Sequence, residues 1–145
     1  MALKWAGGPW VADTSAWARA AAPQVATQWK KAARAGELVG CPVVTLELLY
    51  GASDREQVEI LTAALAGLQD APITRAVTSA AIRAVRELAE RGAAGWHRVR
   101  VPDALVAAAA AERGFGVLHY DHHFDRLAEV LSFRSQWVAP SGSVP

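Results

Sequence analysis

The sequence predicts a single α/β domain with helices flanking a mostly parallel central sheet. Apolar or β-rich runs alternate with helical patterns along all 145 residues, and no internal repeat or linker divides the chain. Such alternation is typical of parallel sheets, and this length suits about one domain. We expect the domain to cover residues 1–145, with its core at about 10–138 and a frayed tail at 140–145.

The first expected strand, residues 9–12, ends at an acidic side chain, Asp13. The hydroxyls of Thr14 and Ser15 can bond free N–H groups of a first helical turn, so we expect them to cap the helix that follows. Pro23 then interrupts that helix.

A second apolar helical pattern runs to Gly36, a residue suited to end a helix. Residues 38–41 are the next expected strand. The following helix is expected to start at Thr45 and to end at Gly51, which places Glu47 in its first turn. An acid there is favoured by the helix dipole even without a functional role.

Two amphipathic helices are expected after Ser53 and Thr74, because apolar side chains recur there at spacings of three or four residues. Neither helix concentrates chemically reactive residues. We therefore assign both to packing or to the surface that a partner protein contacts.

The last third predicts helix, strand and helix. Pro102 suits a first helical turn, and Asp103 follows it at the positive end of the dipole. Residues 117–120 form a compact strand that ends at Asp121, and a last helix with an apolar face covers residues 124–131.

Four carboxylates thus stand where a strand or apolar run gives way to a helix: Asp13, Glu47, Asp103 and Asp121. The ends of parallel strands meet along one crevice, so these side chains are expected to converge. Two such charges about 4 Å apart repel by about 1 kcal/mol even in water. Mg²⁺ or Mn²⁺, which prefer oxygen ligands, removes that repulsion and assists phosphodiester hydrolysis by activating water and stabilising phosphoryl charge.

The motifs VADTS (11–15), LELLYGA (46–52), PDALVAA (102–108) and LHYDHHFD (118–125) occur in this order. Together they resemble the PIN-domain nucleases and, among these, the VapC toxins of bacterial toxin–antitoxin pairs. The resemblance spans about residues 10–138. It implies a ribonuclease whose Mg²⁺ or Mn²⁺ is held by the four carboxylates, with the hydroxyl of Thr14 or Ser15 orienting a water or ligand. It also implies a homodimer and an antitoxin that fills the active-site groove.

The last motif departs from the commonest family form, which has an acid two residues after Asp121. His123 stands there instead, and Asp125 is either a partial replacement or, as we favour, an acid at a helix start. An imidazole and carboxylate site built from His119, His122 or His123 is the less favoured reading. The strand should turn His119 away from the face that Tyr120 uses, and the turn after Asp121 should keep the other two from sharing its ligand geometry.

Composition limits the partners. The net charge is +1, which gives no global attraction for a polyanion, so any RNA contact must be local, for example at Arg98 and Arg100. No apolar run approaches a membrane span, and the N-terminus lacks the pattern of a secretory signal, so we expect a cytoplasmic protein.

Cys41 is the single cysteine and is expected to be buried. Most of the six tryptophans are expected in the core or at an interface, with Trp17 the best candidate to contact RNA or antitoxin.

Two alternatives stay open. A histidine pair, with His119 or His122, could cleave RNA without a metal as general acid and base. The chain could also be a PIN-like binding module without turnover. Dinucleotide or nucleoside triphosphate binding is disfavoured, because the sequence has neither G-x-G-x-x-G after a strand nor a P-loop.

Overall fold

The five strands in the described part of the chain run parallel in one sheet, in the order β3-β2-β1-β4-β5, which confirms the predicted α/β class. The computed structural model describes residues 3–92 and 94–145. The strands are β1 (Trp10–Ala12), β2 (Leu38–Gly40), β3 (Gln69–Asp70), β4 (Gly116–His119) and β5 (Ser135–Trp137). The two central neighbours, β1 and β4, carry two of the predicted acids just beyond their ends.

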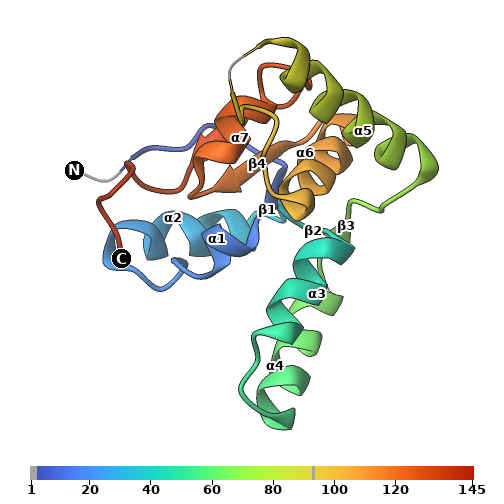
Figure 1. Cartoon of the computed structure of the whole chain (residues 1–145). Helices are drawn as coiled ribbons and strands as arrows, with labels where there is room; N and C mark the ends of the chain where they lie inside the picture. The colour runs from blue at the N-terminus through green and yellow to red at the C-terminus, as the bar shows by residue number, and fades with distance from the viewer. Residues whose placement is uncertain (1–2, 93) are drawn as a thin grey trace.

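Helices cover both faces of the sheet (Figure 1). They are α1 (Thr14–Trp17), α2 (Pro23–Arg34), α3 (Pro42–Tyr50), α4 (Arg55–Ala66), α5 (Arg75–Glu90), α6 (Val101–Arg113) and α7 (His122–Leu127). Alternation along β1 divides the core, since Trp10 and Ala12 pack with α1 and α2, whereas Val11 packs with α5 and α6. Cys41 is buried, as predicted. None of the helices within the described ranges is both long and apolar enough to cross a bilayer.

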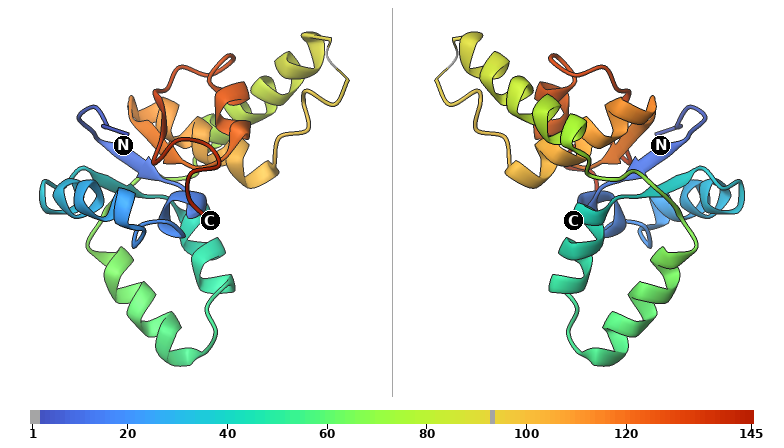
Figure 2. Two further views of the ribbon diagram at one scale, coloured as in Figure 1. Left: turned by 90° about the vertical axis from the view of Figure 1, so that its left-hand side faces the viewer. Right: turned by 90° about the vertical axis from the view of Figure 1, so that its right-hand side faces the viewer.

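The pair formed by α3 and α4 extends away from the rest of the molecule, as both side views show (Figure 2). α4 follows Ser53, as the sequence predicted, and Asp54 caps it, but none of its residues is buried. By contrast, α5 buries one face, including Val77 and Leu88, and packs along α6. Of the two helices assigned to packing or to a partner, α5 is therefore mainly a packing element and α4 is mainly surface.

Two predicted helix starts are wrong. The carboxylate of Asp13, not the hydroxyl of Thr14 or Ser15, caps α1, because Asp13 is extended and accepts the N–H of Ser15. Helix α3 begins at Pro42 instead of Thr45, since proline fits the first helical position. Glu47 is therefore in the second turn of α3, and a role as an acid of the first turn is excluded.

Other predicted boundaries also shift. β4 starts and ends one residue before the predicted 117–120, and α7 stops at Leu127 well before residue 131. The sequence did not indicate β3 and β5, which have only two and three residues. The tail at 140–145 was expected to fray, but Val144 is 8% exposed and its N–H donates to the hydroxyl of Tyr120 at 3.0 Å. The tail therefore packs against the body.

Candidate functional site

The four predicted carboxylates gather at the carboxyl ends of β1 and β4. Asp13 follows β1 and Asp121 follows β4, each as the N-cap residue of the next helix. Asp103 lies in the first turn of α6. Glu47 joins the group through contacts with Thr14 and Arg100, which also lies 3.9 Å from Asp103. The convergence that parallel topology predicts is therefore present.

Asp13 is buried, with 2% of its surface exposed. Its Oδ2 accepts the hydroxyl of Ser15 at 2.5 Å and the N–H of Ser15 at 3.0 Å, whereas its Oδ1 has no hydrogen-bond partner among the described residues. Burial raises the pKa of this carboxyl, and the nearby charge of Glu47 adds to that rise. An unpartnered buried carboxylate oxygen is costly, which makes this atom a natural ligand for a cation.

The centre of the group is formed by Asp103, Asp121 and His123. Nδ1 of His123 lies 2.9 Å from Oδ2 of Asp103 and 3.6 Å from Oδ1 of Asp121. Asp103 is 1% exposed, and burial raises its pKa to about 6; its bond with His123 opposes this shift, while the charges of Asp13 and Asp121 reinforce it. The expectation that the turn keeps His123 from sharing a ligand geometry with Asp121 is therefore wrong.

Glu47 occupies the outer side of the group. Its Oε1 accepts the hydroxyl of Thr14 at 2.9 Å, and its Oε2 lies 2.9 Å from Nη2 of Arg100. Thr14 is thus the residue that orients Glu47, while Ser15 orients Asp13. Both hydroxyls that the family resemblance singled out contact carboxylates of the group.

Asp125 points to a different neighbourhood. Its Oδ1 accepts from the indole N–H of Trp137 at 3.2 Å and from the hydroxyl of Ser135 at 3.3 Å, and its Oδ2 lies 3.6 Å from Nδ1 of His122. It lies in the first turn of α7, as our favoured interpretation held. Its carboxylate therefore contacts β5 and His122. These contacts do not support Asp125 as a replacement for the acid that the family motif has two residues after Asp121.

His119 lies in a strand, as predicted, and its side chain is fully buried. Nε2 is 2.6 Å from the hydroxyl of Ser135, and the ring stacks on Phe124 with centroids 4.9 Å apart. Burial lowers the pKa of His119 to about 4, so the ring is neutral near pH 7. Trp17 packs edge-on against Trp29 and is half-buried, so it is mainly a core residue.

Three groups could hold a metal ion together. Ligand atoms of Asp103, Asp121 and His123 all lie within 4.8 Å of one another. One cation can bridge atoms at such separations, and with the unpartnered oxygen of Asp13 nearby the arrangement fits a divalent ion. Our sequence reasoning missed the contributions of His123 and Arg100. The available signal was the position of His123, two residues after Asp121, where the family resemblance led us to expect an acid.

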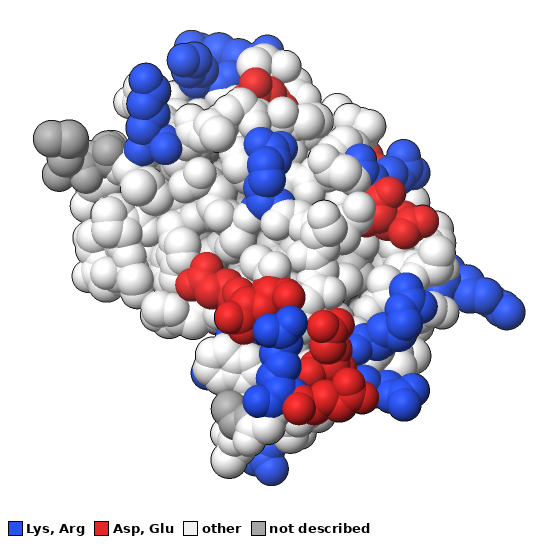
Figure 3. Space-filling view, turned by 90° about the horizontal axis from the view of Figure 1, so that it is seen from above, with Lys and Arg blue, Asp and Glu red and all other residues white. Residues whose placement is uncertain are grey.

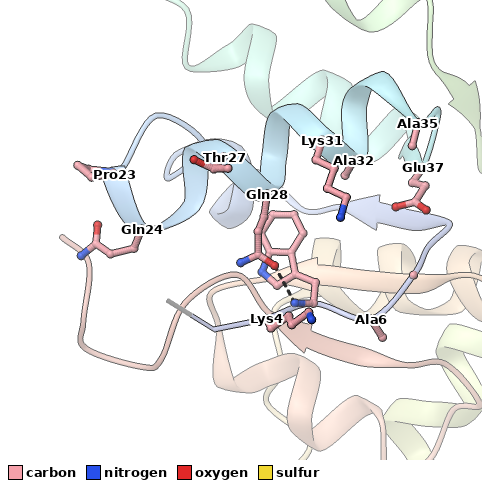
Figure 4. A pocket seen from close by; sticks show the side chains of 12 residues that line it. Lys4, Ala6, Pro23, Gln24, Thr27, Gln28, Lys31, Ala32, Ala35 and Glu37 are labelled. Atoms are coloured by element: carbon pink, nitrogen blue, oxygen red, sulfur yellow. Dashed lines mark hydrogen bonds between the residues drawn. The ribbon is translucent and has the colours of Figure 1, made fainter. Parts of the chain in front are cut away.

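A hollow of about 710 Å³ opens beside this group, lined by Thr14, Leu46, Glu47, Leu49, Tyr50 and Arg100. A second hollow, of about 570 Å³, lies between the N-terminal segment and α2, and none of the four predicted carboxylates is among its described lining residues (Figure 4). Lys4 and Lys31 line it, and Glu37 is its one acidic side chain among the described lining residues. Elsewhere, the face over α5 and α7 mixes both signs of charge (Figure 3), in keeping with the small net charge.

Comparison with known proteins identifies the family of the chain. The family described as the PIN domain matches residues 11–130. Ribonuclease VapC18 of Mycobacterium tuberculosis is 36% identical over 132 residues, covering 91% of this chain and 96% of that protein. Ribonuclease VapC51 of the same organism is 33% identical over 144 residues, covering 99% of both chains.

Solved structures share the fold at low identity. A DNA-bound VapBC structure from Salmonella typhimurium superposes with a TM-score of 0.69 at 18% identity, covering 90% of this chain and 98% of that chain. VapBC-5 from Mycobacterium tuberculosis gives a TM-score of 0.56 at 24% identity, covering 69% and 81%. With the family match over residues 11–130 and these relatives, the chain belongs to the PIN-domain family and is a VapC-type member of it.

Proposed function

We propose that this protein is a metal-dependent endoribonuclease that acts as the toxin of a toxin–antitoxin pair. The observation that carries the proposal is the grouping of Asp103, Asp121 and His123 within 4.8 Å, beside a buried oxygen of Asp13 that has no partner among the described residues. Mutual repulsion disfavours such a group without a cation.

In this proposal Asp13, Asp103 and Asp121 hold Mg²⁺ or Mn²⁺, and Glu47 completes the acidic site. The ion, when bound, lowers the pKa of a water ligand and neutralises charge that develops on the phosphoryl group. The hydroxyl of Ser15 holds Oδ2 of Asp13, which leaves Oδ1 of Asp13 available for the ion. The hydroxyl of Thr14 holds one oxygen of Glu47. The second oxygen of Glu47, once released by Arg100, can accept a proton from a water held over the site.

The substrate and partner follow from the relatives. Two relatives of at least 33% identity are named ribonucleases, which supports RNA as the substrate. Three structural neighbours are VapBC structures, two of them bound to DNA, which supports an antitoxin as partner. A homodimer remains a proposal carried by the family resemblance.

The test is cleavage of a defined RNA by purified protein, with and without a divalent ion. The proposal predicts cleavage with Mg²⁺ or Mn²⁺, its loss with EDTA and its return when excess ion is added. Cleavage that persists in EDTA would select the metal-independent histidine mechanism. Burial of His119 and its bond with Ser135 already disfavour that mechanism. Metal binding without cleavage of any RNA would select the binding module.

A further inference from the structure

His123 has its ring nitrogen among carboxylates. The separations are 2.9 Å from Nδ1 to Asp103 and 3.6 Å from Nδ1 to Asp121, and 25% of the side chain is exposed. The backbone N–H of His123 also donates to Oδ1 of Asp121 at 2.9 Å. This helix cap fixes the backbone of His123 beside Asp121, so the approach of the two side chains is built into the start of α7.

These separations match those of ligands that share one ion. Two ligand atoms about 2.1 Å from an ion and at right angles to each other are about 3 Å apart. The two distances from Nδ1 are close to that value, and the three ligand atoms span no more than 4.8 Å. One ion can bind all three groups after small side-chain rotations, since no two of the atoms lie more than 4.8 Å apart.

Without a cation, Nδ1 faces groups with opposite demands. The backbone N–H of Arg100 lies 3.2 Å from it as a donor, whereas Oδ2 of Asp103 lies 2.9 Å from it as an acceptor. One ring nitrogen carries either a proton or a lone pair, so it cannot satisfy both. A cation between the nitrogen and the carboxylates removes the conflict, and water can replace the nitrogen at the exposed N–H of Arg100.

A second observation points to a cation and not to a simple histidine and aspartate pair. Asp13 is 2% exposed and acts electrostatically on Asp103, and its Oδ1 has no partner within the described part of the chain. A bond between His123 and Asp103 leaves this oxygen unsatisfied. A bound cation satisfies it.

We propose that His123 supplies a nitrogen ligand to the divalent ion, so that this site binds Mn²⁺ in preference to Mg²⁺. This inference rests on the proposed function. Mg²⁺ is bound almost entirely through oxygen. Mn²⁺ also prefers oxygen but, as a first-row transition ion, it accepts a single imidazole nitrogen more readily than Mg²⁺ does. An aspartate at position 123 would give an all-oxygen site and remove most of the preference.

The direct test is electron spin echo envelope modulation of the Mn²⁺-loaded protein, which detects a ¹⁴N nucleus bonded to the ion. We expect ¹⁴N modulation in the wild type and in His122→Ala, and its loss in His123→Ala. His122 is a matched control because it is the adjacent histidine, is 72% exposed and contacts Asp125 outside the group. Circular dichroism verifies that each variant folds.

Calorimetry supplies a second readout that does not depend on ¹⁴N. His123→Asp should lower the ratio of the Mg²⁺ to the Mn²⁺ dissociation constant by about tenfold, because it exchanges nitrogen for oxygen. Wild-type protein that binds Mn²⁺ without ¹⁴N modulation, or an unchanged ratio in His123→Asp, would overturn the inference and leave the proposed function intact. No Mn²⁺ uptake at all would instead reject the metal site of the proposed function.

Discussion

Nη2 of Arg100 lies 2.9 Å from Oε2 of Glu47, although 53 residues separate them in sequence. Nη1 of Arg100 also lies 3.9 Å from Oδ1 of Asp103. The chain therefore places one of its own cations against two carboxylates of the group. This arginine offsets part of the negative charge that a divalent ion would otherwise neutralise.

Arg100→Ala should strengthen Mn²⁺ binding, because it removes a positive charge that competes with the ion. The expected gain in affinity is on the order of fivefold, equivalent to about 1 kcal/mol. At the same time the KM for RNA should rise, since a guanidinium beside the site can contact phosphate. Arg100→Lys, which keeps the charge, is the control for both effects. Isothermal titration and steady-state cleavage measure them, and weaker Mn²⁺ binding in Arg100→Ala contradicts this reading.

Asp103→Asn should reduce RNA cleavage by at least about a hundredfold while the protein stays folded. The substitution removes a buried carboxylate that lies close to the charges of Asp13 and Asp121. The Tm of the metal-free protein should rise for the same reason. Asp125→Asn is the matched control, because Asp125 contacts Ser135 and Trp137 outside the group. Equal losses of cleavage in the two variants would argue against the assigned site.

Asp103 should stabilise the metal-free protein at low pH and lose that contribution as the pH rises, whereas the buried ring of His119, whose pKa is lowered to about 4, makes a contribution of the opposite sign. Burial raises the pKa of Asp103 from 3.8 to about 6 and also raises that of Asp13. A raised pKa means that the folded state binds protons more tightly than the unfolded state. The resulting stabilisation is complete below about pH 4 and is lost as the pH rises through about 6.

Thermal unfolding in EDTA between about pH 4 and about pH 8 measures this effect. The Tm of Asp103→Asn relative to that of the wild type should increase as the pH rises through about 6, because His119 is common to both proteins, and added Mn²⁺ should stabilise the wild type more at high pH than at low pH. Identical pH profiles for wild type and Asp103→Asn would show that Asp103 does not carry the effect.

The sequence was sufficient to predict the sheet and the convergence of Asp13 and Asp121, because these acids follow strands that are neighbours in the sheet. The short outer strands β3 and β5 could not be predicted. Gln69 and Asp70 are polar and exposed, so neither burial nor alternation marks them.

The contacts of Arg100 and of His123 were missed for two different reasons. Arg100 meets Glu47 only because α3 and the start of α6 lie side by side, and a local pattern contains no such long-range contact. The placement of His123 depends on the cap of α7, where Asp121 accepts the N–H of the residue two positions later. Recognition of Asp121 as an N-cap residue would have placed His123 beside it.

The exposed apolar side chains predict where an antitoxin binds. Ile60 of α4 and Ile82 of α5 are 61% and 57% exposed. Ile82 lies on a helix that already buries its opposite face on α6. Ile60 instead belongs to the projecting pair of α3 and α4, where Leu46 and Tyr50 are exposed as well. Burial of one such side chain is worth about 2 kcal/mol. Ile60→Asp should therefore weaken co-purification of a co-expressed antitoxin at least about tenfold, and Ile82→Asp should not. The reverse pattern would assign the surface to α5.

Anomalous diffraction at the manganese absorption edge, from crystals grown with Mn²⁺, tests most directly whether the gathered carboxylates bind an ion. We predict one strong peak in contact with Asp103 and Asp121 and next to the free oxygen of Asp13, and no such peak in crystals of Asp103→Asn grown in the same way. Manganese found only elsewhere on the molecule, with none between these carboxylates, would contradict the account.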